Sequence, residues 1–199
     1  MPQGTIWLIW VALFVGASIP LNRLLPWIAS SLQELDSTLD KPRSKAIRAW
    51  SPIVSGWVIV LSVFKGWLAW TVAIGYGMPD WAQATTLAVV IVGHSWTIFS
   101  DDHPTPFWVL IGVFLAMSPP LMFLFLGAFG LTSLLLNLPH LAIVLSVAIT
   151  AYSAMSAGTL SSIGLPVIIG ITLLTVTPKI AEMFDDLPPT LWGLFVKRR

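Results

Sequence analysis

The sequence predicts an all-α, polytopic membrane protein with about seven transmembrane helices in a single domain, residues 1–199. Composition is the first reason, because 56% of the residues are hydrophobic and only 10% are charged, whereas a soluble domain carries about 25% charged residues. The second is a stretch without Asp, Glu, Lys or Arg between Asp102 and Lys179, long enough for about three spans of about 20 residues. The third is that the apolar runs are continuous, whereas strands of a membrane barrel alternate in polarity.

The first half of the chain is expected to hold three spans, at about residues 6–27, 53–74 and 81–99. A polar loop at about 30–51 separates the first two. Glycine and proline predict a short turn at 75–79, and the polar segment 100–104 ends the third span. No basic residue precedes the first apolar run, so we expect a retained span and not a cleaved signal peptide.

Proline and polar residues divide the second half into shorter apolar segments. The breaks lie at Pro119-Pro120, at residues 137–140 and at residues 156–159, because proline interrupts a helix. Tilted, buried or half-spanning helices are expected among the segments, and an amphipathic tail is expected from Pro178. The four segments are about residues 104–117, 119–136, 141–155 and 160–176.

Basic residues predict the orientation. Four of them lie in the first loop and three close the chain, and the positive-inside rule places both regions in the cytoplasm. The N-terminus is then outside the plasma (inner) membrane and the number of spans is odd, which seven satisfies. Tryptophans near the expected span ends are typical of an interfacial belt. These are Trp27, Trp50, Trp81 and Trp192.

Several classes of function are disfavoured. The net charge is +1, which provides no general field for nucleic acid. Cysteine is absent, which excludes disulfides, thiolate nucleophiles and cysteine metal sites. The sequence contains no Gly-x-Ser-x-Gly elbow, no His-Glu-x-x-His zinc helix and no Walker loop. We therefore expect no metal and no cofactor. A small transporter or channel is disfavoured because few polar residues lie within the spans and no repeat is visible.

Three features are candidates for chemistry, each with a plainer alternative. Lys65 lies in an apolar stretch, where an ionisable residue indicates a functional site, or else snorkels or pairs for structural reasons. His94 near the end of the third span suits a base or a phosphate ligand, or else is a hydrogen-bonded structural residue. The cations of the first loop suit a phosphorylated substrate or lipid headgroup, or else only set the topology.

The order of several fragments resembles the bacterial acyl-phosphate:glycerol-3-phosphate acyltransferases. Ser18-Ile19-Pro20 is similar to that family's Gly-Ser-Ile-Pro, and Lys65-Gly66 and Gly93-His94 are similar to its Lys-Gly and Gly-His. Arg48 matches its loop arginine. At Thr38 and Ser44 one hydroxyl residue stands in place of another. Gly112 and Ala116-Met117-Ser118-Pro119 are similar to that family's Gly and Ala-x-Ser-Pro. The resemblance covers most of the chain, though in patches, and implies seven spans with the N-terminus outside.

Departures fall where the family's chemistry should be. Its phosphate loop, Phe-Lys-Gly-Gly-Lys-Gly, is here Asp101-Asp102-His103-Pro104-Thr105-Pro106. Aspartates repel an anion and prolines remove N–H donors, whereas glycines and lysines would bind one. Its C-terminal His-Arg-Glu-Asn is here about Pro178-Lys179-Ile180-Ala181. The resemblance therefore implies the family's architecture with a divergent active site.

The resemblance implies acyl transfer from acyl phosphate to glycerol 3-phosphate, within phospholipid biosynthesis, with these two substrates and membrane lipid as partners. His94 would be the catalytic residue, and Arg48, Lys65, Thr38 and Ser44 would bind substrate or phosphate. The alternative is a non-catalytic relative that binds lipid or a membrane partner. The lost phosphate loop favours the alternative, and the surviving Arg48, Lys65 and His94 favour the enzyme. We expect these three to approach one another, with Lys65 the hardest to bring close because it lies about 25 Å along a helix from Arg48.

Overall fold

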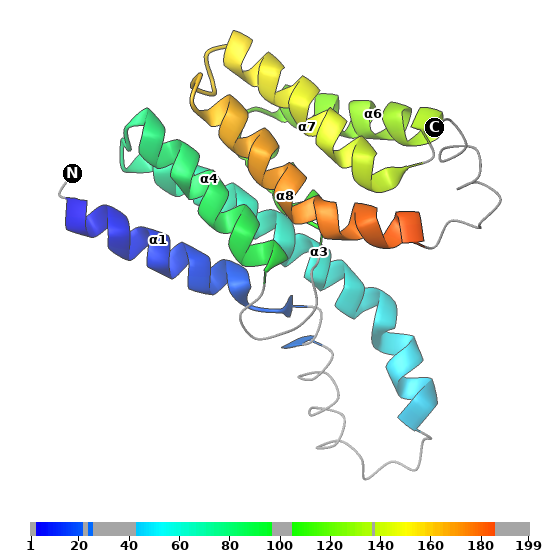
Figure 1. The fold of residues 1–199 in the computed structure, drawn as a ribbon. Coiled ribbons are helices and arrows are strands. Elements are labelled where there is room, and N and C mark those ends of the chain that lie inside the picture. The colour runs from blue at the N-terminus through cyan, green and yellow to red at the C-terminus, as the bar shows by residue number, and fades with distance from the viewer. Residues whose placement is uncertain (1–2, 22–23, 26–42, 97–104, 137, 186–199) are drawn as a thin grey trace.

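A computed structural model describes residues 3–21, 24–25, 43–96, 105–136 and 138–185, without the side chains of 43–53, 55 and 179–185. These residues form seven helices and no strand (Figure 1). The all-α prediction is confirmed for this part of the chain. The helices are α1 (Gln3–Ser18), α3 (Arg43–Gly75), α4 (Asp80–Ser95), α5 (Phe107–Met117), α6 (Pro119–Leu136), α7 (Pro139–Ser156) and α8 (Gly164–Asp185).

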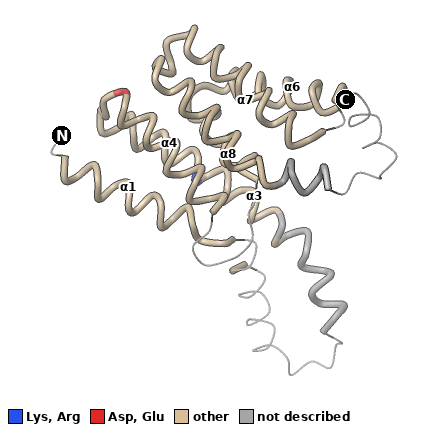
Figure 2. The backbone as a smooth tube through the Cα atoms, in the orientation of Figure 1, with Lys and Arg blue, Asp and Glu red and all other residues tan. Residues whose placement is uncertain are grey.

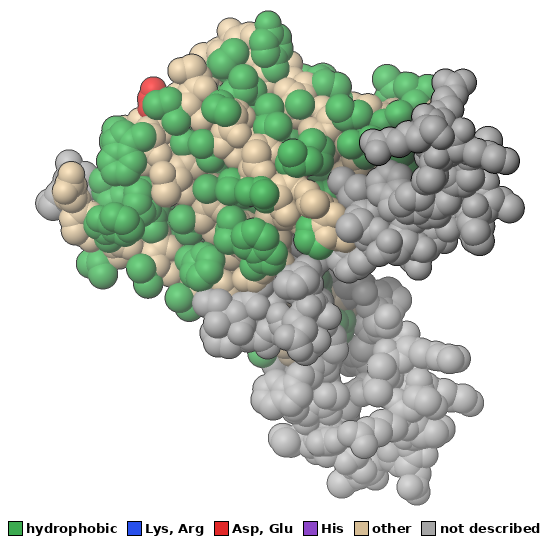
Figure 3. Space-filling view, viewed as in Figure 1, with side chains coloured by type: hydrophobic (Ala, Val, Ile, Leu, Met, Phe, Trp, Pro, Cys, Tyr) green, Lys and Arg blue, Asp and Glu red, His purple; other side chains and the backbone are tan. Residues whose placement is uncertain are grey.

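Three helical segments are long and apolar enough to cross a membrane: Gly56–Gly75 within α3, and the whole of α6 and α7. Large apolar side chains are exposed over the surface of the bundle (Figure 3). Leu134 and Leu135, for example, are 85% and 74% exposed. An exposed apolar surface of this kind marks contact with a membrane or a partner. Together with the three long segments, it indicates membrane association.

The helices lie side by side around a large apolar core, and a second, smaller apolar cluster lies between α1, α3 and α4. α4 packs against α1, α3 and α8, α5 packs against α3 and α6, and α7 packs between α6 and α8. Phe114, Phe125 and Leu87 are fully buried between them. The start of α1, the α3–α4 connection and the α7–α8 connection lie at one end of the bundle, which we call the turn end (Figure 1). Asp80 is exposed at this end (Figure 2).

Glycines allow α3 and α5 to approach closely. A Cβ added at Gly66 would collide with the carbonyl of Val109, and a Cβ added at Gly112 would collide with the carbonyl of Val63. Each helix thus presents a glycine to the backbone of the other, as is common where helices pack in a membrane. The match of Gly66 and Gly112 to the acyltransferase pattern therefore has a packing explanation that needs no substrate.

Three expected boundaries were wrong. The first span was expected to extend to about residue 27, but α1 ends at Ser18, because Pro20 has no N–H to continue the helix. The first loop was expected to extend to residue 51, but α3 already begins at Arg43, because apolar composition marks the buried part of a helix and not its polar extension. The tail was expected to start at Pro178, but α8 continues through that proline to Asp185. The expected turn at 75–79 is present and has Gly77 at a φ of 58°. The expected break at Pro119 is the start of α6.

Candidate functional site

The most polar place in the described interior lies where α1 ends. α1 ends at Ser18, and the last carbonyls of a helix have no donor within it, while Pro20 has no N–H with which to continue the helix. The ammonium of Lys65, from the middle of α3, donates to two carbonyls at this end, those of Ala17 and Ile19. The distances from Lys65 Nζ are 2.8 Å to Ala17 O and 2.9 Å to Ile19 O. Lys65 therefore stabilises the C-terminal end of α1, where the helix dipole favours a cation.

Close packing holds the end of α1 against α4. A Cβ at Gly93 would lie 2.9 Å from the carbonyl oxygen of Phe14 and 3.0 Å from the Cβ of Ala17. Ser18 is fully buried and donates to Phe14 O at 2.8 Å. Glycine at position 93 thus allows the next residue of α4, His94, to lie beside the end of α1.

The imidazole of His94 is almost completely buried, with 8% of the residue exposed. It is hydrogen-bonded to the backbone of Thr105, and it lies close enough to Lys65 for an electrostatic interaction. Thr105 belongs to the segment 101–106, which is expected from the sequence to stand in place of a phosphate loop. We call Lys65, His94, the carbonyls of Ala17 and Ile19, and the backbone of Thr105 the polar cluster.

The structure thus brings together two of the residues predicted from sequence, Lys65 and His94. Arg48 and Ser44 lie in α3, but their side chains are outside the described set, and Thr38 lies outside the described residues. Lys65 reaches the cluster because it lies in α3 beside the end of α1, where its Nζ bonds to Ala17 O and Ile19 O. The roles of these residues in substrate binding stay predictions.

Sequence reasoning missed the partners of Lys65 and His94. Both partners are backbone groups, and the side chains of the residues that provide them give no sign of this. The available signal was Pro20, which indicates that the first helix ends nearby and so leaves its last carbonyls without helical donors. The alternative reading of Lys65 was that it pairs for structural reasons, and in the structure it pairs with two carbonyls.

The chemistry of the cluster is that of donors and a buried imidazole. No group of three or more His, Cys, Asp or Glu residues that could hold a metal occurs in the described chain. Asp80 is the one carboxylate among the described side chains, and it lies at the turn end. The cluster can therefore donate hydrogen bonds to an anion or a polarised oxygen, provided that Lys65 leaves or shares its carbonyl partners.

Comparison with protein-family models, with curated proteins and with solved structures gives no match to this chain.

Proposed function

We propose that the chain is a polytopic protein of the plasma (inner) membrane with seven spans, an external N-terminus, and a cytoplasmic first loop and C-terminus. The seven helices supply the elements for an odd number of crossings, and the basic first loop and tail supply the positive-inside signal. The positions of the α3–α4 and α7–α8 connections at one end of the bundle support the alternation of direction (Figure 1).

We further propose that it is a divergent acyl-phosphate-dependent glycerol-3-phosphate acyltransferase of phospholipid biosynthesis. The observation that carries this proposal is that Lys65 and His94 meet at the end of α1: Lys65 donates to Ala17 O, and Gly93, next to His94, packs against Ala17. In the reaction, the 1-hydroxyl oxygen of glycerol 3-phosphate bonds to the acyl carbon, the bond from that carbon to the phosphate oxygen breaks, and phosphate leaves as the hydroxyl proton is released. Lys65 and Arg48 would hold phosphate groups, and His94 would orient or polarise the substrate.

A second candidate is a non-catalytic relative that binds a phosphate-headed lipid or a membrane partner. The hydrogen bonds of Lys65 and His94 favour it, because both side chains are already used by the backbone. An ammonium and an imidazole that stabilise helix ends need no substrate. Their proximity would then be a consequence of packing.

The two candidates differ in turnover. The test is to incubate purified protein in nanodiscs with acyl phosphate and radiolabelled glycerol 3-phosphate and to measure lysophosphatidic acid. We expect slow turnover, because one donor to a developing oxyanion is worth about 3–4 kcal/mol and the replaced loop removes several. His94→Ala should abolish that turnover. Thr85→Ala should not change it, because Thr85 lies toward the turn end and away from the polar cluster. Headgroup binding without turnover would favour the non-catalytic relative. Turnover as fast as that of an acyltransferase with the intact lysine-glycine loop would contradict the view that the replaced loop weakens catalysis.

A further inference from the structure

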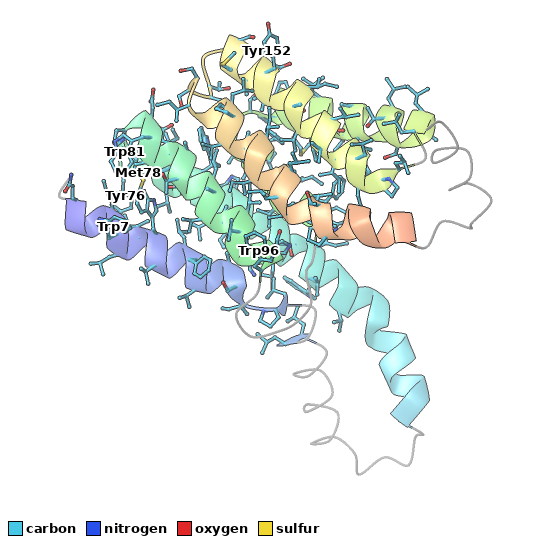
Figure 4. All side chains as sticks on the ribbon, viewed as in Figure 1. Trp7, Tyr76, Met78, Trp81, Trp96 and Tyr152 are labelled. Carbon is cyan, nitrogen blue, oxygen red and sulfur yellow. The ribbon has the colours of Figure 1, made fainter. Side chains whose placement is uncertain are left out.

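Four exposed aromatic side chains with polar tips gather at the turn end. Trp7 is in α1, Tyr76 is in the α3–α4 connection, Trp81 is in α4 and Tyr152 is near the end of α7 (Figure 4). They are between 47% and 64% exposed. Trp7 and Trp81 both pack edge-on against the buried Trp10, with ring centroids 5.1 Å and 5.8 Å from its own. We call these four exposed residues the aromatic rim.

Chemistry distinguishes the rim from the surface next to it. Tryptophan and tyrosine combine an apolar ring with an N–H or O–H donor, which suits the layer between hydrocarbon and water. Asp80 is exposed at the same end and marks contact with water. Further along α1 the exposed side chains include Val11 and Val15, which have no polar tip, whereas α3 exposes Val60 together with Trp57 and Trp67. The surface of α1 therefore changes from amphipathic at the turn end to apolar beyond it.

Helix length determines what lies at the other end. α1 and α4 have 16 residues each, which is about 24 Å, whereas the hydrocarbon core of a bilayer is about 30 Å thick. If the rim holds the turn end at one interface, the whole shortfall falls at the opposite ends of α1 and α4. His94 lies at this end of α4, and the carbonyl of Ile19, just beyond α1, accepts a hydrogen bond from Lys65 of α3.

We propose that the aromatic rim binds the headgroup and glycerol layer of one leaflet, and that the polar cluster consequently lies within the hydrocarbon depth of the opposite leaflet, where water reaches it from that side. This inference rests on the membrane-spanning part of the proposed function. Free carbonyls and a charge at such depth are tolerated where protein or water surrounds them. Water access also gives a polar substrate a route to Lys65 and His94.

The absence of cysteine allows a direct test, because each single-cysteine variant has one reactive thiol. Spin labels are placed at Trp7→Cys, Tyr152→Cys, Val11→Cys and Ile19→Cys in protein reconstituted into phosphatidylcholine vesicles. Accessibility to oxygen, which concentrates in hydrocarbon, and to a water-soluble nickel chelate then reports depth. Elution as a single species and unchanged helical circular dichroism show that each variant is folded.

We expect the labels at Trp7 and Tyr152 to report the same interfacial depth. The label at Val11 should be accessible to oxygen and not to nickel, and the label at Ile19 should be accessible to nickel. A difference of more than one helical turn, about 5 Å, between Trp7 and Tyr152 would overturn the rim, and a label at Ile19 that behaves like that at Val11 would overturn the hydrated cluster. Nickel access at Val11 would instead reject the membrane-spanning proposal itself, which separates the two failures.

Discussion

At the scale of single residues, the sequence singled out Lys65 and His94, which the structure places at the same end of α1, but it did not reveal their partners. Lys65 stands out because a lysine in an apolar stretch is costly, and His94 stands out because it follows a glycine near the end of a span. The carbonyls of Ala17 and Ile19 that bind Lys65 lie more than 45 positions away. Contacts over such distances depend on how the helices pack, which one sequence does not contain.

Replacing Lys65 with methionine should destabilise the protein, because two carbonyls at the end of α1 would lose a charged donor while the volume stays similar. A hydrogen bond to a charged group contributes about 1.5–3 kcal/mol, so the unfolding free energy in detergent should fall by at least about 1.5 kcal/mol. Thr85→Ala is the matched control, since Thr85 is near solvent or lipid and bonds only to Trp81 O of its own helix. If the two variants melt at the same temperature, Lys65 does not stabilise α1.

At the scale of helices, proline correctly marked two helix starts, whereas neither proline nor apolar composition marked every helix boundary. Pro79 and Pro119 correctly predicted where α4 and α6 begin, because proline is accepted at a helix start and disfavoured inside. Arg43 at the start of α3 and Pro178 inside α8 were missed. A polar helical extension has no apolar signal, and a helix tolerates an internal proline when packing against its neighbours offsets the lost hydrogen bond.

Glycine substitutions on α3 should separate packing from helix propensity. Gly66→Ala places a Cβ against the carbonyl of Val109, so α3 and α5 must move apart, and we expect a loss of about 1–3 kcal/mol. Gly56→Ala, on the same helix, has nothing within 4 Å of the added Cβ and should be neutral or stabilising by up to about 1 kcal/mol. Thermal denaturation in one detergent compares them, and equal midpoints would contradict the close α3–α5 contact.

At the scale of the whole molecule, three segments of the described chain are both long and apolar enough to cross a membrane. The helix least suited to crossing the membrane is α5, because its 11 residues span only about 16 Å. Four helices, α4 to α7, lie between the α3–α4 and α7–α8 connections. These connections share a side of the membrane only if the number of crossings between them is even, so their relative placement tests whether α5 crosses.

Tyr76 and Ser162 are exposed in these two connections and suit single-cysteine labelling. In intact cells, Tyr76→Cys and Ser162→Cys should both react with a membrane-impermeant maleimide, because four crossings return the chain to the outer side. Ser37→Cys, in the basic first loop, should react only after the membrane is permeabilised, since positive charge keeps that loop inside. Labelling of Tyr76→Cys but not of Ser162→Cys would mean that one of the four helices does not cross the membrane. The short α5 would be the first helix to examine. In that case the total would be even, and the positive C-terminal tail would lie on the opposite side of the membrane from the first loop.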